Sequence, residues 1–153
     1  GYVITNNAGY TAGDLVFSTR SATTDSVAVE AGRFDSSANF KFNSGFGSVA
    51  TAYGCRAWAN MGVSGGTLTV NSSAGFSSIT RTATGYFTAA FSTTMPDANY
   101  SLCGNVSSGV GLGYLFWNVS GSPGSNSTTT MYFNTATGGG FADYPKFSIA
   151  VFR

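Results

Sequence analysis

The chain contains no histidine among its 153 residues. This absence excludes Ser-His-Asp and Cys-His nucleophilic sites, and with them the zinc sites that use histidine. Charge is also scarce, because charged residues make up 8% of the chain, against about 25% in an ordinary domain. Seven basic and six acidic side chains leave a net charge of +1, too little for a surface that follows nucleic-acid phosphates. We therefore expect no nucleic-acid partner.

The six carboxylates are too dispersed to predict a hydrolase. A glycosidase needs two carboxylates that flank the scissile bond, but four of the six lie in the first 35 residues. Asp97 lies in a Met-Pro-Asp-Ala-Asn turn, where a short carboxylate commonly caps its own backbone, and Asp143 has no partner nearby in the sequence. Neither lysine occurs in a Ser-x-x-Lys spacing. We expect no catalytic residue, no metal site and no cofactor.

Two cysteines, Cys55 and Cys103, are too few for a disulfide framework and lack the paired spacing of a zinc ribbon. Each is expected to be a small buried hydrophobe. A single disulfide between them is the alternative, because both lie in predicted strands. No apolar run approaches the ~20 residues of a membrane span, so membrane insertion is not expected. The chain begins at Gly1 without a methionine and is expected to be part of something longer.

Small polar and aromatic residues dominate what is present. Leu, Met, Lys, Glu and Gln together contribute 11 residues, so the chain lacks the residues that helices prefer. The 13 Phe, 8 Tyr and 2 Trp supply apolar area instead, since each buried aromatic ring removes about 150–250 Å² from water. This composition predicts an all-β fold.

Apolar and polar residues alternate with a period of two along the whole chain, and Gly, Ser, Asn and Pro clusters interrupt the alternation. In the first fifty residues the pattern predicts strands at 15–18, 27–34 and 40–42, with too little apolar surface to fold alone. Eight further strands are predicted at 55–61, 66–71, 76–83, 85–91, 99–106, 112–120, 128–134 and 145–153. We expect an antiparallel β-sandwich or jelly roll over residues 51–153, preceded by a β-rich segment over residues 1–50.

The alternation also predicts which side chains face the interior of the sandwich. Their neighbours in sequence are Thr, Ser and Ala, as expected for strands with one buried face. The predicted inward residues are Leu68, Val70, Phe87, Phe91, Met131, Phe133, Phe147, Ile149 and Val151.

Several segments share a combination of residues with one protein family. Residues 54–61 read Gly-Cys-Arg-Ala-Trp-Ala-Asn-Met, and residues 93–100 read Thr-Thr-Met-Pro-Asp-Ala-Asn-Tyr. Upstream, residues 13–19 read Gly-Asp-Leu-Val-Phe-Ser-Thr and residues 33–40 read Arg-Phe-Asp-Ser-Ser-Ala-Asn-Phe. Together these segments resemble the C-terminal part of bacteriophage tail fibre proteins, and residues 101–145 match that pattern least well.

The resemblance implies a non-catalytic receptor-binding protein at the distal end of the tail fibre of a virion, assembled in the host cytoplasm. Residues 1–50 would be a short intertwined β shaft segment, joined to the remainder of the fibre, and residues 51–153 the receptor-binding tip. Fibres of this kind are homotrimers, and three chains together could bury the apolar strands of residues 13–42. The receptor would be a host cell-surface glycan or an outer-membrane protein. A polysaccharide depolymerase and a purely structural or assembly domain are the alternatives.

Binding residues are expected in the loops at 106–112, 120–128 and 135–144, which are rich in Gly and Ser. Alternation places Tyr114 and Phe116 on one face of their strand and Leu115 and Trp117 on the other, so one aromatic set is less buried. Core packing is the alternative for both. The predicted receptor-binding residues are Tyr114, Trp117, Asn126, Phe141, Asp143 and Tyr144.

Other residues are expected to be structural. Arg56 is expected to pair with a carboxylate or a carbonyl group, and Trp58 to pack against a neighbouring subunit or sheet. Replacement of Tyr144 or Asp143 is expected to weaken receptor binding without a change in melting temperature, whereas loss of Trp58 is expected to destabilise the protein.

Overall fold

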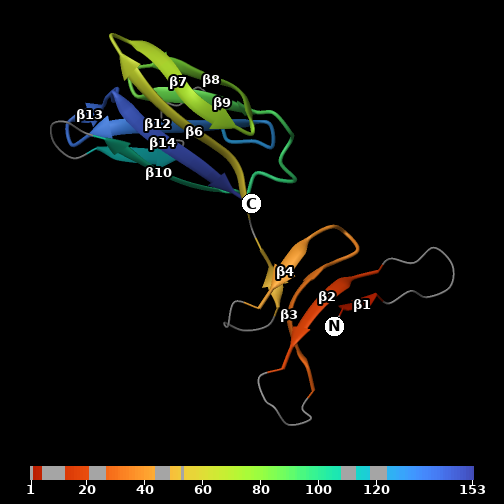
Figure 1. Cartoon of the computed structure of the whole chain (residues 1–153). Coiled ribbons are helices and arrows are strands. Elements are labelled where there is room, and N and C mark those ends of the chain that lie inside the picture. Colours follow the sequence, from red (N-terminus) through yellow and green to blue (C-terminus); the bar gives the residue numbers. More distant parts are fainter. Residues whose placement is uncertain are drawn as a thin grey trace. The chain divides into compact units, whose positions relative to one another are not determined.

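The computed structural model describes residues 2–4, 13–20, 27–43, 49–52, 54–107, 113–117 and 124–153. All of the regular structure in these ranges is β-strand, and every strand pairing is antiparallel, which confirms the all-β prediction. The described part of the chain holds no helix long and apolar enough for a membrane crossing. The chain divides into two compact units, Gly1–Tyr53 and Gly54–Arg153 (Figure 1).

The first unit is a single five-stranded sheet in the order β1-β2-β3-β4-β5. Its strands are β1 (Tyr2–Ile4), β2 (Leu15–Thr19), β3 (Val29–Phe34), β4 (Phe40–Phe42) and β5 (Ala50–Thr51). The β3–β4 turn is fixed by Asp35, whose Oδ1 accepts hydrogen bonds from the backbone N–H groups of Ser37 and Asn39, both at 3.0 Å. Lys41 pairs with the same carboxylate at 2.8 Å, and these contacts lower the pKa of Asp35. Short polar side chains of this kind stabilise tight turns.

One face of this sheet is aromatic. The pairing aligns Leu15, Phe34 and Phe40 in one row across β2, β3 and β4, and it aligns Phe17 and Phe42 on either side of Gly32 in the next row. We call this surface the aromatic face; its residues are Leu15, Phe17, Phe34, Phe40 and Phe42. Their exposed fractions are 36%, 46%, 47%, 42% and 41% in that order.

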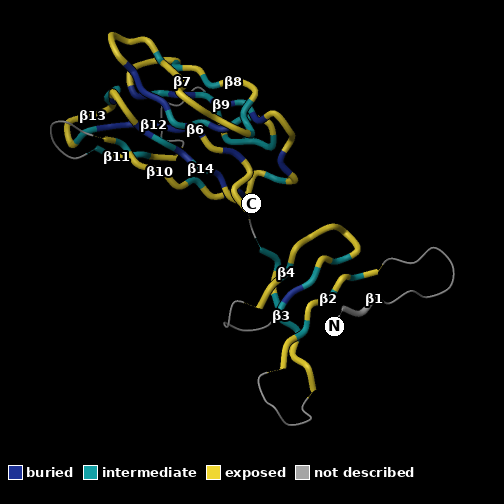
Figure 2. The backbone as a smooth tube through the Cα atoms, in the orientation of Figure 1, coloured by how far each residue is buried: buried dark blue, intermediate teal, exposed yellow. Residues whose placement is uncertain are grey.

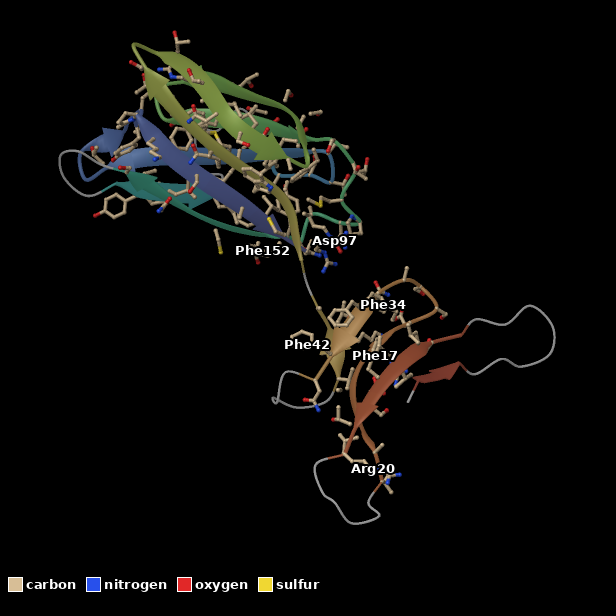
Figure 3. The ribbon with its side chains drawn as sticks, viewed as in Figure 1. Phe17, Arg20, Phe34, Phe42, Asp97 and Phe152 are labelled. Atoms are coloured by element: carbon tan, nitrogen blue, oxygen red, sulfur yellow. The ribbon has the colours of Figure 1, made fainter. Side chains whose placement is uncertain are left out.

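The opposite face of the sheet is charged. Arg33 lies there and forms ion pairs with Asp14, at 2.7 Å, and with Glu30. Among residues 13–20, 27–43 and 49–52 of the first unit, only Gly32 is buried (Figure 2). A Cβ atom at that position would lie 2.9 Å from the carbonyl oxygen of Lys41, so the sheet has no room for a side chain there. The first unit is therefore an amphipathic layer whose apolar side chains remain open to solvent; Figure 3 labels Phe17, Phe34 and Phe42.

The second unit is a sandwich of two sheets, in the orders β10-β14-β6-β7 and β11-β12-β9-β8, with β13 paired to β12. Its strands are β6 (Cys55–Ser64), β7 (Thr67–Ala74), β8 (Phe76–Ala83), β9 (Tyr86–Phe91), β10 (Ser101–Ser107), β11 (Tyr114–Trp117), β12 (Thr130–Thr137), β13 (Gly140–Phe141) and β14 (Lys146–Phe152). The core between the sheets contains Met61, Phe87, Met131, Phe133 and Phe147, each at most 1% exposed. The rings of Phe87 and Phe133 stack with their centroids 5.1 Å apart.

The predicted inward residues are mostly correct. Seven of them are buried: Phe87, Phe91, Met131, Phe133, Phe147, Ile149 and Val151. Leu68 is partly buried against the core. Val70 was predicted wrongly, because it is 38% exposed although it pairs with the buried Met61. Since β7 is the last strand of its sheet, no further strand covers Val70 from the side.

The two cysteines differ from expectation. Cys55 and Cys103 are exposed and have free thiols, so their predicted burial is wrong. Both lie next to β14, but on opposite sides of it: Cys103 pairs with Ala150 and Cys55 pairs with Phe152. The intervening strand separates the thiols, and no disulfide joins them.

The expectations for Arg56 and Trp58 have different outcomes. The Arg56 Nε donates a hydrogen bond to the carbonyl oxygen of Arg153 at 3.0 Å, as predicted. Trp58 is 42% exposed, so packing against a second sheet of its own unit, one of the two alternatives, is wrong. Contact with a neighbouring subunit stays a prediction.

The sandwich has two distinguishable ends. We call the end that contains the start of β6 and the C-terminal residue the near end, and the opposite end the far end. At the near end, Cys55 lies beside Phe152, and Asp97 pairs with Arg153; Figure 3 labels Asp97 and Phe152 there. At the far end, the N–H of Val63 donates to the carbonyl oxygen of Tyr144 at 2.7 Å. Strand β13 also lies at the far end, well separated from the C-terminus (Figure 1).

Candidate functional site

Aromatic side chains gather at the far end, on the outer face of the β11-β12-β9-β8 sheet. Phe116 of β11 pairs with Asn134 of β12, which in turn pairs with Tyr86 of β9. Directly paired residues of an antiparallel sheet lie on the same face, so Phe116 and Tyr86 flank Asn134. Asn134 is fully buried, and its Nδ2 donates to the carbonyl oxygen of Gly85 at 3.3 Å.

A second row repeats this arrangement one step along the strands. Tyr114 of β11 pairs with Ala136, and Ala136 pairs with Phe141 of β13. Ala136 is 4% exposed. We name the four rings around these two small residues the outer aromatic cluster; it consists of Tyr86, Tyr114, Phe116 and Phe141. In each row, one aromatic residue lies on either side of a buried residue, which is Asn134 in the first row and Ala136 in the second.

The rings of the cluster contact each other in two pairs and remain accessible to a ligand. The centroids of Tyr86 and Phe141 are 4.5 Å apart, and those of Tyr114 and Phe116 are 5.9 Å apart. Tyr114, Phe116 and Phe141 are 40%, 38% and 40% exposed. Surfaces of this kind suit the apolar faces of sugar rings or the side chains of a partner protein.

Asp143 lies beside the cluster, mostly buried, and supports it through contacts within the chain. Its carboxylate accepts hydrogen bonds from the Nε of Arg81 at 3.0 Å and from the backbone N–H of Gly85 at 2.9 Å. Burial alone would raise the pKa of Asp143, but Arg81 and the Gly85 N–H outweigh it and lower the pKa. Gly85 has a φ of +70°, and a Cβ there would lie 2.4 Å from the carbonyl oxygen of Thr135. Both oxygens of Asp143 are engaged within the chain, so the structure gives it a supporting role at the cluster, and its receptor contact stays a prediction.

Replacement of Asp143 by Asn is expected to lower the free energy of unfolding by about 2 kcal/mol at pH 7, because charged hydrogen bonds are lost. The folded-state pKa of Asp143 is lowered, so its contribution is complete above the unfolded pKa of about 3.9. It disappears as pH falls through the folded value. The difference between wild type and Asp143→Asn should therefore shrink below about pH 4, as measured by urea unfolding at a series of pH values.

The more exposed Asp97–Arg153 pair offers a matched control for this pH series. Its side chains are 35% and 29% exposed, and exposed ion pairs stabilise proteins by only about 0–1 kcal/mol. Asp97→Asn should thus cost less than Asp143→Asn at pH 7. Equal stability of wild type and Asp143→Asn across the whole pH range would show that Asp143 does not brace the far end.

Tyr144 is also structural, which overturns its prediction as a receptor contact. It is 5% exposed, and its hydroxyl donates to the carbonyl oxygen of Ala136 at 2.8 Å. Gly113 lies against its ring, since a Cβ at Gly113 would be 3.1 Å from two of its ring carbons. Tyr144 therefore belongs to the core beneath the outer aromatic cluster.

Trp117 and Asn126 make their contacts away from the outer aromatic cluster, around Tyr100 and the start of β12. The indole of Trp117 stacks on Tyr100 at a centroid distance of 5.3 Å, and the hydroxyl of Tyr100 donates to the carbonyl oxygen of Ser127 at 3.1 Å. The Oδ1 of Asn126 accepts a hydrogen bond from the backbone N–H of Tyr132 at 2.6 Å. The described part of the first predicted loop, residues 124–128, therefore lies apart from the second, at 135–144.

Of the six predicted residues, the structure brings Tyr114 and Phe141 together on one exposed surface. Residues 108–112 and 120–123 of two predicted loops, and residues 118–119 of the strand predicted at 112–120, lie outside the described residues. Tyr86 was missed as a site residue. Alternation with the inward-facing Phe87 could have placed it on the outer face, but not beside Phe141.

The carboxylates of the second unit do not form a pair. Asp97 lies at the near end with Arg153, and Asp143 lies at the far end with Arg81. Within the ranges described, no three Cys, Asp or Glu side chains group as metal ligands. The chemistry available to the outer aromatic cluster is stacking and hydrogen bonding.

Comparisons with protein-family models, with curated proteins and with solved structures give no match. The similarity to tail fibres thus rests on the residues quoted above.

Proposed function

We propose that this chain is the distal, receptor-binding end of a bacteriophage tail fibre. It attaches the virion to a glycan or outer-membrane protein of the host surface, without catalysis. The observation that carries the proposal is the outer aromatic cluster, whose exposed rings lie at the end of the sandwich away from Gly54 and Arg153. Aromatic residues are enriched at binding surfaces and stack on sugars.

The first unit supports the homotrimer that such a fibre requires. A segment of about 50 residues buries too little surface to be stable alone, and here its aromatic face is 36–47% exposed at five positions. Association of three chains through these faces would remove the rings from water. The charged opposite face, with Arg33 bound to Asp14 and Glu30, would remain outside.

A double variant, Tyr114→Ala with Phe141→Ala, tests the attachment surface. It removes two exposed rings that flank Ala136, and we expect attachment to host cells to weaken at least tenfold, or about 1.4 kcal/mol. The melting temperature should change little, because surface substitutions usually cost under about 0.5 kcal/mol. Competition by the purified protein in an adsorption assay measures the first effect, and thermal unfolding measures the second.

Val70→Ser is the matched control, because Val70 is exposed to a similar degree, 38%, at the edge strand β7. It should leave attachment unchanged. If the double variant adsorbs normally while folded, the outer aromatic cluster is not the attachment surface. Release of new reducing ends from host polysaccharide by the wild-type chain would replace the proposal with a depolymerase.

A further inference from the structure

The outer face of the other sheet, β10-β14-β6-β7, contains a separate polar depression of about 280 Å³. Three strands contribute to it in register: Asn105 of β10 pairs with Ser148 of β14, which pairs with Asn60 of β6. The next row contains Ser107 paired with Lys146. None of these residues belongs to the outer aromatic cluster, which lies on the other sheet.

The hydrogen bonds within this depression orient its amide groups. The Ser148 hydroxyl donates to the Oδ1 of Asn105 at 2.8 Å. The Nδ2 of Asn71 donates to the Oδ1 of Asn60 at 3.1 Å. Both amide oxygens are thus already engaged by the protein. The groups presented to a ligand are the amide N–H donors of Asn60 and Asn105 and the ammonium group of Lys146.

The positive charge of Lys146 in this depression is not balanced by a carboxylate of the second unit. Residues 54–153 contain two acidic residues, Asp97 and Asp143, and these pair with Arg153 and Arg81. No carboxylate of the second unit is therefore left to pair with Lys146. A site that combines one cation with amide donors is complementary to an anionic group that accepts hydrogen bonds.

An aromatic platform adjoins the depression. Trp58 lies two residues before Asn60 on β6, on the same face, and its cross-strand neighbours are Ala150 and Ala74. Because each of these two alanines has only a methyl group as its side chain, the indole of Trp58 remains 42% exposed. Two residues along a strand span about 6.8 Å, so a sugar ring on Trp58 would be about one sugar unit away from the amide of Asn60 and further from that of Asn105.

We propose that this face binds an acidic oligosaccharide, with its anionic group at Lys146 and Asn105 and another sugar ring of the same chain on Trp58. The site lies apart from the outer aromatic cluster and does not depend on that cluster being the attachment surface. The anionic group is a carboxylate, as in a uronic acid, or a phosphate on the sugar. Both are hydrogen-bond acceptors that a lysine recognises as a point charge.

Isothermal titration calorimetry of the whole chain with three probes tests the proposal. The probes are tetragalacturonate, the same tetrasaccharide with its carboxyl groups reduced to alcohols, and a phosphorylated mannotetraose. We expect at least one acidic probe to bind at least tenfold more tightly than the neutral one. The preference should weaken as salt is raised, since salt screens exposed charges. The stronger of the two acidic probes identifies the anionic group.

Two nearly isosteric variants link the binding to this site. Lys146→Gln removes the cation, and Asn105→Asp places a carboxylate next to Lys146; each should lower the affinity for the acidic probe about tenfold or more. Tyr114→Ala, on the other sheet, should not. Thermal unfolding confirms that each variant is folded. The proposal fails if no acidic probe binds, if the neutral tetrasaccharide binds equally well, or if both folded variants retain wild-type affinity.

Discussion

A chain in which Phe17 and Phe42 are both replaced by Ser is expected to be a monomer of 15.7 kDa at micromolar concentration. The wild-type chain is expected to have about three times that mass under the same conditions. These two rings flank Gly32 in the middle of the aromatic face and are 46% and 41% exposed in the single chain. Buried aromatic anchors at the centre of an interface commonly contribute 2 kcal/mol or more each, on the order of a 30-fold change in affinity per residue.

Multi-angle light scattering during size-exclusion chromatography measures this difference. Lys41→Gln is the control, because Lys41 lies on the charged face of the same sheet, where it pairs with Asp35 and not with the rings of the aromatic face. It should leave the trimer intact. A wild-type chain that is monomeric at micromolar concentration would refute the trimer, and a trimeric double variant would show that subunits associate through another surface.

Replacement of Tyr144 by Ala is expected to lower the free energy of unfolding of the second unit by about 3–5 kcal/mol, as for other large aromatic residues cut back to Ala in a core. The ring is 5% exposed, and its hydroxyl bonds to the carbonyl oxygen of Ala136. Loss of Tyr144 removes both the packing and that hydrogen bond. Urea denaturation followed by tryptophan fluorescence measures the change.

Tyr144→Phe and Trp58→Ala serve as comparisons. Tyr144→Phe keeps the ring and should cost only about 1 kcal/mol, the usual value of one hydrogen bond. Trp58→Ala removes a larger ring, but this ring is 42% exposed, so the second unit alone should lose less stability than with Tyr144→Ala. If Tyr144→Ala unfolds at the wild-type urea concentration, the ring does not contribute to the core.

The strands were predictable because apolar and polar residues alternate along a half-buried strand, and this alternation is visible in the sequence of that strand alone. Residues 76–83 and 40–42 were predicted with the bounds that β8 and β4 have. The alternation of Phe87 and Phe91 with smaller residues placed them correctly in the core. Strand β5, with only two residues, is too short to show a period and was missed.

The site was less predictable because it depends on which strands become neighbours. The sequence around Tyr114 indicates a two-faced strand, but only the register brings Tyr114 and Phe141 to the same Ala136. Tyr144 follows a run of glycines and was therefore expected in an open loop. Its carbonyl oxygen instead accepts a bond from Val63, 81 positions earlier in the numbering, and its ring is buried in the core. No local pattern contains that information.

The alternation of β9 has a consequence for substitutions. Phe87 and Ala89 face the core, whereas Tyr86 and Thr88 face outward. Substitutions at the inward positions thus change the packing of the core, whereas substitutions at the outward positions leave it intact. Natural proteins tolerate substitutions that keep them above a stability threshold. The outer surface of this sheet can therefore change its chemistry while the core between the two sheets stays the same.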